Sequence, residues 1–232
     1  MLWGYHMILM ILLFAFPLLL GFWAQSRVQS AFKQWKEVDA GGGISGAEAA
    51  KQILGVAGLQ HVEVLPVRDM LGDHYDPQKK QLRLSPEVYR GESVVAMGIA
   101  AHEAGHAIQD AKKYAPLRWR MLAVPATVLM SQMLPLIFIA SLFFQALGRP
   151  LFFLAVGTFV VIALFNLITL PVEFDASRRA KALLREMRIV EGEQKMRGVH
   201  AVLDAAAWTY VAAFVAALGN LFYFLLMRRR PF

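Results

Sequence analysis

The chain has 232 residues, of which 57% are hydrophobic and only 18% are charged, and its formal net charge is +7. Soluble domains usually carry about 25% charged residues, so this composition argues against a soluble enzyme and against a disordered chain. The absence of cysteine excludes disulfides, iron–sulfur clusters and a cysteine nucleophile, and it leaves only nitrogen and oxygen ligands for any metal.

Four stretches of the chain contain no Lys, Arg, Asp or Glu. They cover residues 1–26, 121–148, 150–172 and 205–227, with lengths of 26, 28, 23 and 23 residues. Because a helix needs about 20 apolar residues to cross roughly 30 Å of hydrocarbon, each stretch is long enough to span a bilayer. The sequence therefore predicts a mainly α-helical, polytopic membrane protein with about four transmembrane helices.

Residues 1–26 are predicted to form the first transmembrane helix. No positive charge precedes the apolar run, which is also longer than the core of a signal peptide, so we expect the segment to be retained. Pro17 is expected to kink this helix.

Residues 27–120 are predicted to form a small α+β, zincin-like catalytic portion. Ser45 and Glu48 have the spacing of a capping box, which predicts a helix through about Leu54. Residues 62–67 and 81–85 alternate like strands, and a run of turn-forming residues lies between them at Asp73–Pro77.

Two helix starts follow the second predicted strand. Ser85 and Pro86 are typical of an N-cap and a first helical position. A longer helix is then expected from about Ser93 to Asp110, and it carries the motif described below.

The remainder of the chain alternates between apolar and charged segments. Residues 121–172 are predicted to be a transmembrane hairpin that crosses at 122–147, turns at Gly148–Pro150 and returns at 151–170. Residues 173–204 are expected to form an amphipathic helical segment. Residues 205–232 are expected to contain the last transmembrane helix and a basic C-terminus.

The distribution of positive charge along the chain indicates the orientation of the protein in the membrane. Thirteen Lys and Arg residues lie in 27–120 and seven in 173–204, against four elsewhere. The positive-inside rule then places these two polar segments in the cytoplasm of a bacterial-type plasma membrane and both termini outside. Three of the other four basic residues follow the last apolar stretch directly; if that stretch does not cross, the C-terminus is cytoplasmic instead.

The motif that indicates a catalytic metal site is H-E-x-x-H, formed by His102, Glu103 and His106. On a helix, residues four apart lie on one face, so the two imidazoles can meet at one zinc ion. Glu103 projects about 100° around the helix from His102, so its carboxylate can accept a proton from a metal-bound water instead of binding the metal itself. Val95 and Ile99 continue the histidine stripe, so this face is expected to be buried.

A catalytic zinc usually has three protein ligands, so one more must come from elsewhere. Asp110 lies about 12 Å along the helix from His102, too far to share an ion with it. Glu173 and its rival Asp175 follow the third apolar stretch, which returns to the same side of the membrane as His106. From topology alone Glu173 is the better candidate, and Asp175 is its main rival.

Other side chains around the motif have less specific patterns. Small residues at 101, 104, 105 and 107 leave room for a neighbouring element to pack closely on the motif helix. An oxyanion-stabilising donor could come from His74, Tyr75, His200 or Tyr210, and the pattern selects none of them. The predicted strand 81–85 could pair by its edge with an extended peptide.

Several motifs in order resemble the YugP-type membrane zinc metallopeptidases. They are Leu71–Pro77, Leu84–Tyr89, Ala101–Gln109, Leu170–Ala180 and Thr209–Ala213. The resemblance covers nearly the whole chain, and it implies that Glu173 is the third zinc ligand. The chain is more distantly similar to the HtpX and CAAX-prenyl proteases, which carry an aspartate four residues after the metal-binding glutamate, where this chain has Ser177.

The sequence thus predicts a membrane-embedded, zinc-dependent endopeptidase that hydrolyses peptide bonds with a metal-activated water. His102, His106 and Glu173 are the expected Zn²⁺ ligands and Glu103 the expected catalytic base. Expected partners are the lipid bilayer and a protein or peptide substrate, membrane proteins among them, but no nucleic acid. The alternative is a catalytically silent membrane scaffold or regulatory protein with a structural zinc; a transporter would need charged groups inside its spans.

Overall fold

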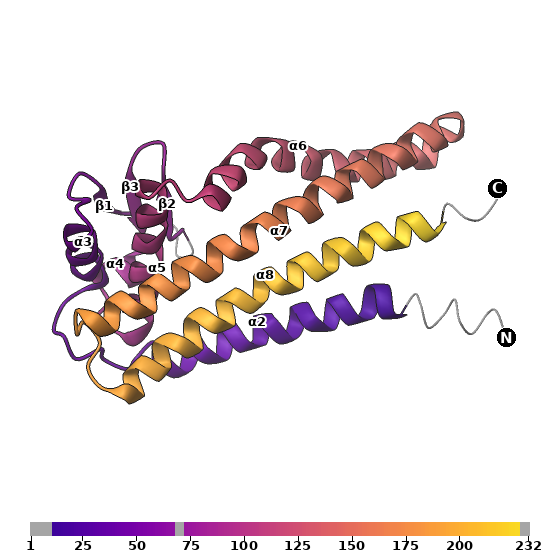
Figure 1. The fold of residues 1–232 in the computed structure, drawn as a ribbon. Helices are drawn as coiled ribbons and strands as arrows, with labels where there is room; N and C mark the ends of the chain where they lie inside the picture. Colours follow the sequence, from indigo (N-terminus) through magenta and orange to yellow (C-terminus); the bar gives the residue numbers. More distant parts are fainter. Residues whose placement is uncertain (1–10, 68–71, 228–232) are drawn as a thin grey trace. The chain divides into compact units, whose positions relative to one another are not determined.

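The structure is a computed structural model that describes residues 11–67 and 72–227 (Figure 1). Most of these residues are helical. The chain divides into two compact units, which we call the apolar unit and the polar unit. Among the described residues, the apolar unit consists of 11–24, 118–170 and 209–227, and the polar unit consists of 25–67, 72–117 and 171–208.

Three helices of the described part are long and apolar enough to cross a membrane: α6 (Ala115–Phe143), α7 (Gly148–Glu186) and α8 (Glu193–Met227). Large apolar side chains remain exposed along them, for example Leu122 at 79% and Leu142 at 77%. Apolar surface of this extent is expected where lipid covers the protein. The prediction of an integral membrane protein is therefore supported by three apolar helices.

The predicted first span lies partly outside the described residues, which begin at residue 11. A short π-helical segment, η1 (Ile11–Ala15), precedes α2 (Phe16–Trp35). Leu18, Leu19 and Phe22 on α2 are all more than half exposed.

Two predicted helix ends were wrong. The turn expected at Gly148–Pro150 lies earlier, because α6 ends at Phe143, a 3₁₀ turn η2 spans Gln145–Leu147, and α7 starts at Gly148. Pro150 fits inside the first turn of α7, where backbone N–H groups have no helical acceptor. Nor does the helix of the returning span end at residue 170, since α7 continues through Pro171 to Glu186.

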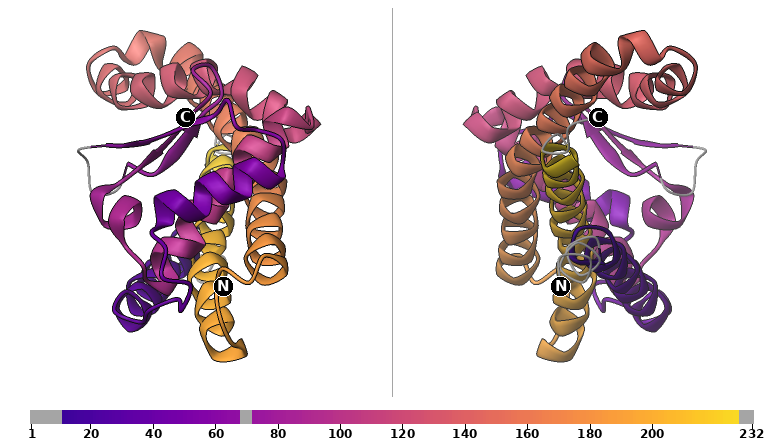
Figure 2. Two further views of the ribbon diagram at one scale, coloured as in Figure 1. Left: turned by 90° about the vertical axis from the view of Figure 1, so that its left-hand side faces the viewer. Right: turned by 90° about the vertical axis from the view of Figure 1, so that its right-hand side faces the viewer.

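The polar unit contains a three-stranded sheet, whose strands lie side by side in Figure 2. Its order is β1-β3-β2, with β1 (Glu63–Pro66) parallel and β2 (His74–Asp76) antiparallel to β3 (Gln81–Leu84). The turn expected at 73–77 is therefore partly a strand. Asp76 accepts hydrogen bonds from the amides of Gln78 and Lys79, which moves the turn to residues after the strand.

The position of β3 corrects the expectation that a peptide could pair with its edge. Because β3 lies between β1 and β2, it offers no free edge to a peptide. The outer strands of the sheet are β1 and β2 instead.

Three helices pack with this sheet, and their starts are as predicted. They are α3 (Gly46–Val56), α4 (Pro86–Arg90) and α5 (Val94–Ala111). Ser45 and Glu48 form the capping box of α3, and the Ser93 side chain caps α5. Alanines at 100, 101, 104 and 107 of α5 are at most 1% exposed, so α5 is a central element of the core.

Candidate metal centre

The helix α5 brings His102 and His106 together. Their ring centroids lie 4.7 Å apart with an interplanar angle of 83°. Residues four apart in an α-helix lie one turn apart on one face, and this spacing accounts for the contact. His106 is buried and His102 is partly buried.

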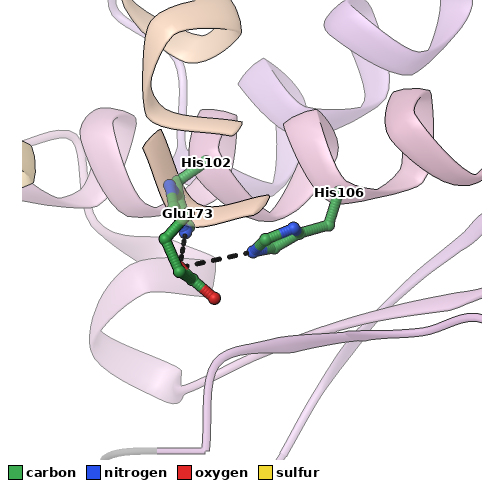
Figure 3. A group of neighbouring side chains, drawn as sticks. All are labelled: His102, His106 and Glu173. Carbon is green, nitrogen blue, oxygen red and sulfur yellow. Dashed lines mark hydrogen bonds and ion pairs between the residues drawn. The ribbon is translucent and has the colours of Figure 1, made fainter. Parts of the chain in front are cut away.

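Glu173 joins the two histidines from α7 (Figure 3). Its Oε2 lies 3.2 Å from His102 Nε2 and 3.7 Å from His106 Nε2, and the residue is 2% exposed. One ligand atom from each of the three residues lies within 4.8 Å of the others.

These distances fit a zinc ion. Ligand atoms about 2.0–2.1 Å from a tetrahedral zinc are about 3.3–3.4 Å apart, close to the two nitrogen–oxygen separations found here. Two imidazole nitrogens and one carboxylate oxygen are also ligands that zinc accepts. The group could therefore hold a metal ion with little rearrangement.

A glycine makes the approach of α7 to α5 possible. A Cβ atom built on Gly105 would lie 2.8 Å from the Ala176 carbonyl oxygen and 3.2 Å from Ala176 Cα. Such distances are shorter than van der Waals contact, so a larger residue would push the backbones apart. The small residues of the motif thus leave room for a neighbouring element, as the sequence indicated.

Each histidine has a second partner at its other ring nitrogen. Ser177 Oγ lies 3.1 Å from His102 Nδ1, and Gln109 Oε1 lies 3.0 Å from His106 Nδ1. Partners of this kind fix the rotation of a metal-binding imidazole. Sequence reasoning missed both contacts, although Gln109 lies three residues after His106 and Ser177 four after Glu173.

Glu103 is buried but is not one of the three grouped residues. Its Oε2 accepts a hydrogen bond of 3.0 Å from the backbone N–H of Tyr75 in β2. The placement agrees with the rotation of about 100° between neighbouring helix positions. The contact with β2 joins residues 28 positions apart, and no local pattern indicates it.

The rival acids are held by other groups. Asp175 Oδ2 accepts from Gln109 Nε2 at 3.0 Å and from Arg179 Nε at 2.6 Å, and Oδ1 pairs with Arg178. Asp110 Oδ2 accepts from the Tyr75 hydroxyl at 2.8 Å and from Lys80 Nζ at 2.6 Å. Neither carboxylate belongs to the group of three.

The conceivable oxyanion donors are not part of the group either. His74 lies in β2 with Nδ1 2.6 Å from the Gly72 carbonyl oxygen. The hydroxyl of Tyr75 is engaged by Asp110. His200 is on α8 in the polar unit, and Tyr210 is on α8 in the apolar unit.

The charges of the site change two pKa values. Glu173 lies outside the expected span 151–170. Burial alone would raise its pKa, but hydrogen bonds and positive charge from His102 and His106 hold this pKa below its usual value. Burial would lower the pKa of His106, yet Glu173 and the negative charge of Glu103 together raise it above 6.5. Without a metal, Glu173 thus stays ionised beside the two imidazoles.

Comparisons with known proteins are consistent with a zinc-binding site. Residues 9–229 match the model of a family described as "Putative neutral zinc metallopeptidase". The chain is 41% identical over 208 residues to the "Putative membrane protease YugP" of Bacillus subtilis (strain 168), which covers 90% of this chain and 91% of the relative. No solved structure matches. The resemblance inferred from the motifs is confirmed: the chain belongs to this family of zinc metallopeptidases.

Proposed function

We propose that the protein is a membrane-embedded, zinc-dependent endopeptidase. His102, His106 and Glu173 are its zinc ligands, and Glu103 is its general base. The observation that carries the proposal is the meeting of Glu173 with the two histidines of H-E-x-x-H, although Glu173 lies 71 residues after His102 in the chain. Membership of a zinc metallopeptidase family supports the same assignment.

The number of ligands favours catalysis over a structural metal. Structural zinc sites are usually closed by four protein ligands, whereas catalytic sites have three and leave one position open. The group found among the described residues has three members. A zinc ion held there would supply a water of lowered pKa and polarise the scissile carbonyl.

The surroundings of Glu103 support its proposed role as the general base. The Tyr75 amide donates to Oε2 and thereby orients the carboxylate, which leaves Oε1 to accept a proton from the attacking water. The protonated Glu103 then donates to the nitrogen of the leaving peptide. Burial of Glu103 limits its rotation, which favours this transfer.

The sheet supports the proposal of a peptide substrate, but at β2 and not at β3, the strand that was first expected to bind it. In β2 the N–H of Tyr75 points to Glu103, away from β3. The outer edge of β2 therefore runs beside the proposed base, where the Tyr75 carbonyl oxygen could accept a backbone hydrogen bond from an extended peptide while the Tyr75 N–H stays with Glu103. We propose that substrates, including membrane proteins, bind there in extended conformation.

The membrane arrangement is also part of the proposal. We propose four transmembrane helices, formed by residues 1–26, the hairpin 121–172 and the start of 205–232. Segments 27–120 and 173–204 together form the catalytic part, with the active site facing the cytoplasm and the N-terminus outside. The division of the structure into an apolar and a polar unit supports this organisation.

The test compares the full-length, detergent-purified protein with two glutamate variants. Glu103→Gln should retain the zinc content of the wild type but cleave an unstructured protein substrate about 10²–10⁴-fold more slowly, because the proton acceptor is lost. Glu87→Gln, an exposed position on α4, is the matched control and should cleave normally. A chelator should stop cleavage by the wild type, and added zinc should restore it.

Two results would contradict the proposal. Cleavage by Glu103→Gln at the wild-type rate would remove the assigned base. A wild type that holds zinc yet cleaves no protein or peptide offered to it would favour the silent scaffold with a structural metal.

A further inference from the structure

Gln109 is a buried polar residue for which the proposed reaction has no direct use. It lies on α5, one turn after His106, and is 0% exposed. Its side-chain amide makes three hydrogen bonds, with His106 Nδ1 at 3.0 Å, the Val172 carbonyl oxygen at 2.8 Å and Asp175 Oδ2 at 3.0 Å. A buried amide with this many partners has a single orientation.

The partners determine which way the amide faces. A backbone carbonyl oxygen only accepts, and so does the Asp175 carboxylate, which is ion-paired with Arg179. The NH₂ group of Gln109 must therefore face Val172 and Asp175, and Oε1 must face His106. Because Oε1 can only accept, the hydrogen of the neutral imidazole is on Nδ1, and the lone pair is on Nε2.

His106 Nε2 is the ring nitrogen that faces the candidate metal site formed by His102, His106 and Glu173. His106 Nε2 lies 3.7 Å from Glu173 Oε2. A metal-binding histidine needs an unprotonated nitrogen pointing at the ion, and a partner on the other nitrogen selects this tautomer.

The same amide also holds the helix that carries the third ligand. Val172 directly precedes Glu173, and Asp175 follows it by two positions. Gln109 thus binds α7 on both sides of Glu173 while it contacts His106 on α5. Asp175 is anchored in turn by Arg178 and Arg179 on the same helix.

We propose that Gln109 is a positioning residue for two metal ligands, fixing the tautomer and rotation of His106 and the position of Glu173 beside it. The inference rests on the proposed zinc site, but it concerns the affinity and geometry of that site and not the hydrolysis. A glutamine that only fills space would affect stability without changing the metal's surroundings.

The test replaces Gln109 by a residue of similar length without hydrogen-bonding groups. In full-length purified protein, Gln109→Met should lower zinc affinity about 10–100-fold, the usual effect of losing an outer partner of a metal ligand. The absorption spectrum of the cobalt-substituted protein should also change, because the ligand geometry is no longer fixed. Affinity is measured by competition with a chromophoric chelator.

A matched variant tests whether any Gln→Met change has this effect. Gln81 on β3 bonds to Glu63 and Arg83, outside the metal group. Gln81→Met should keep the wild-type zinc affinity and cobalt spectrum. If Gln109→Met is folded and keeps both as well, the proposal is overturned.

A measurement on the wild type covers the case in which Gln109→Met does not fold. Nitrogen NMR of the zinc-loaded chain labelled at histidine should show His106 with a hydrogen on Nδ1 and none on Nε2, the signals being assigned by their loss in His106→Gln. A hydrogen on Nε2 would overturn the role of Gln109 while the zinc site itself stands. A wild type that binds no zinc would instead refute the proposed function, and this inference with it.

Discussion

His106 and Glu173 influence each other's protonation, and this has a consequence for metal binding. Glu173, with Glu103, holds the pKa of His106 above 6.5 despite burial, whereas the two imidazoles hold the pKa of Glu173 below its usual value. Zinc requires a neutral imidazole and an ionised carboxylate. Protons therefore compete with zinc at His106, while Glu173 stays ionised.

We expect the zinc affinity of the wild type to rise as the pH increases above 6.5, and to level off above the raised pKa of His106. The folding stability of the metal-free protein should change with pH in the opposite direction. The His106–Glu173 pair contributes stability that is complete below pH 6.5 and is lost as the pH rises through the raised pKa of His106. Chelator competition and thermal unfolding across this pH range measure the two trends. A zinc affinity independent of pH would contradict the account.

At the level of single residues, the sequence predicted what local spacing determines. His102, Glu103 and His106 lie within five positions, so helix geometry alone relates them. Glu173 needed topology and a family resemblance, because 71 residues separate it from His102. The contacts of Ser177 and Gln109 depend on how α5 and α7 pack, which no spacing within one helix determines.

At the level of elements, the close packing of α5 against α7 decides whether the three proposed ligands meet. Gly105 is the contact point, with Ala176 backbone atoms 2.8–3.3 Å from where its Cβ would be. Gly98 lies on the same helix but has only ordinary contacts, the nearest at 3.8 Å from Val199. The two glycines therefore form a matched pair for substitution by alanine.

Gly105→Ala is expected to destabilise the protein by about 1–3 kcal/mol through overpacking. Zinc affinity should fall about tenfold or more as Glu173 moves away from the histidines. Gly98→Ala should be neutral or slightly stabilising, since alanine favours the helix by up to about 1 kcal/mol. Thermal unfolding and zinc titration check both variants, and equal behaviour of the two would refute the packing argument.

Elements with clear local signals were predicted correctly, and those without were not. The capping residues Ser45 and Ser93 mark the starts of α3 and α5. The strand β2 was missed because it has only three residues, drawn from a turn-like run. The span was expected to end at residue 170, yet α7 passes through Pro171, since one missing hydrogen bond is tolerated in a long helix that is held by its neighbours.

At the scale of the whole molecule, the proposed orientation in the membrane rests on charge alone and can be tested directly. The chain has no cysteine, so a single introduced thiol reports its own accessibility. Lys51→Cys on α3 and Ala146→Cys in η2 are both at exposed positions.

With the polar segments in the cytoplasm, a membrane-impermeant maleimide should label Ala146→Cys in intact cells and leave Lys51→Cys unlabelled. Permeabilised cells, in which both should react, are the control. Labelling of Lys51→Cys alone in intact cells would place the metal group on the outer side and reverse the proposed topology.

Glu173 of α7 is proposed to complete a zinc site with the two histidines of α5. Zinc content of the purified, full-length chain tests it most directly, with Glu173→Ala compared with Glu186→Ala, an exposed position at the end of the same helix. The account predicts about one zinc per chain in the wild type and in Glu186→Ala, and loss of most of it in Glu173→Ala. Full zinc occupancy in a folded Glu173→Ala protein would contradict it.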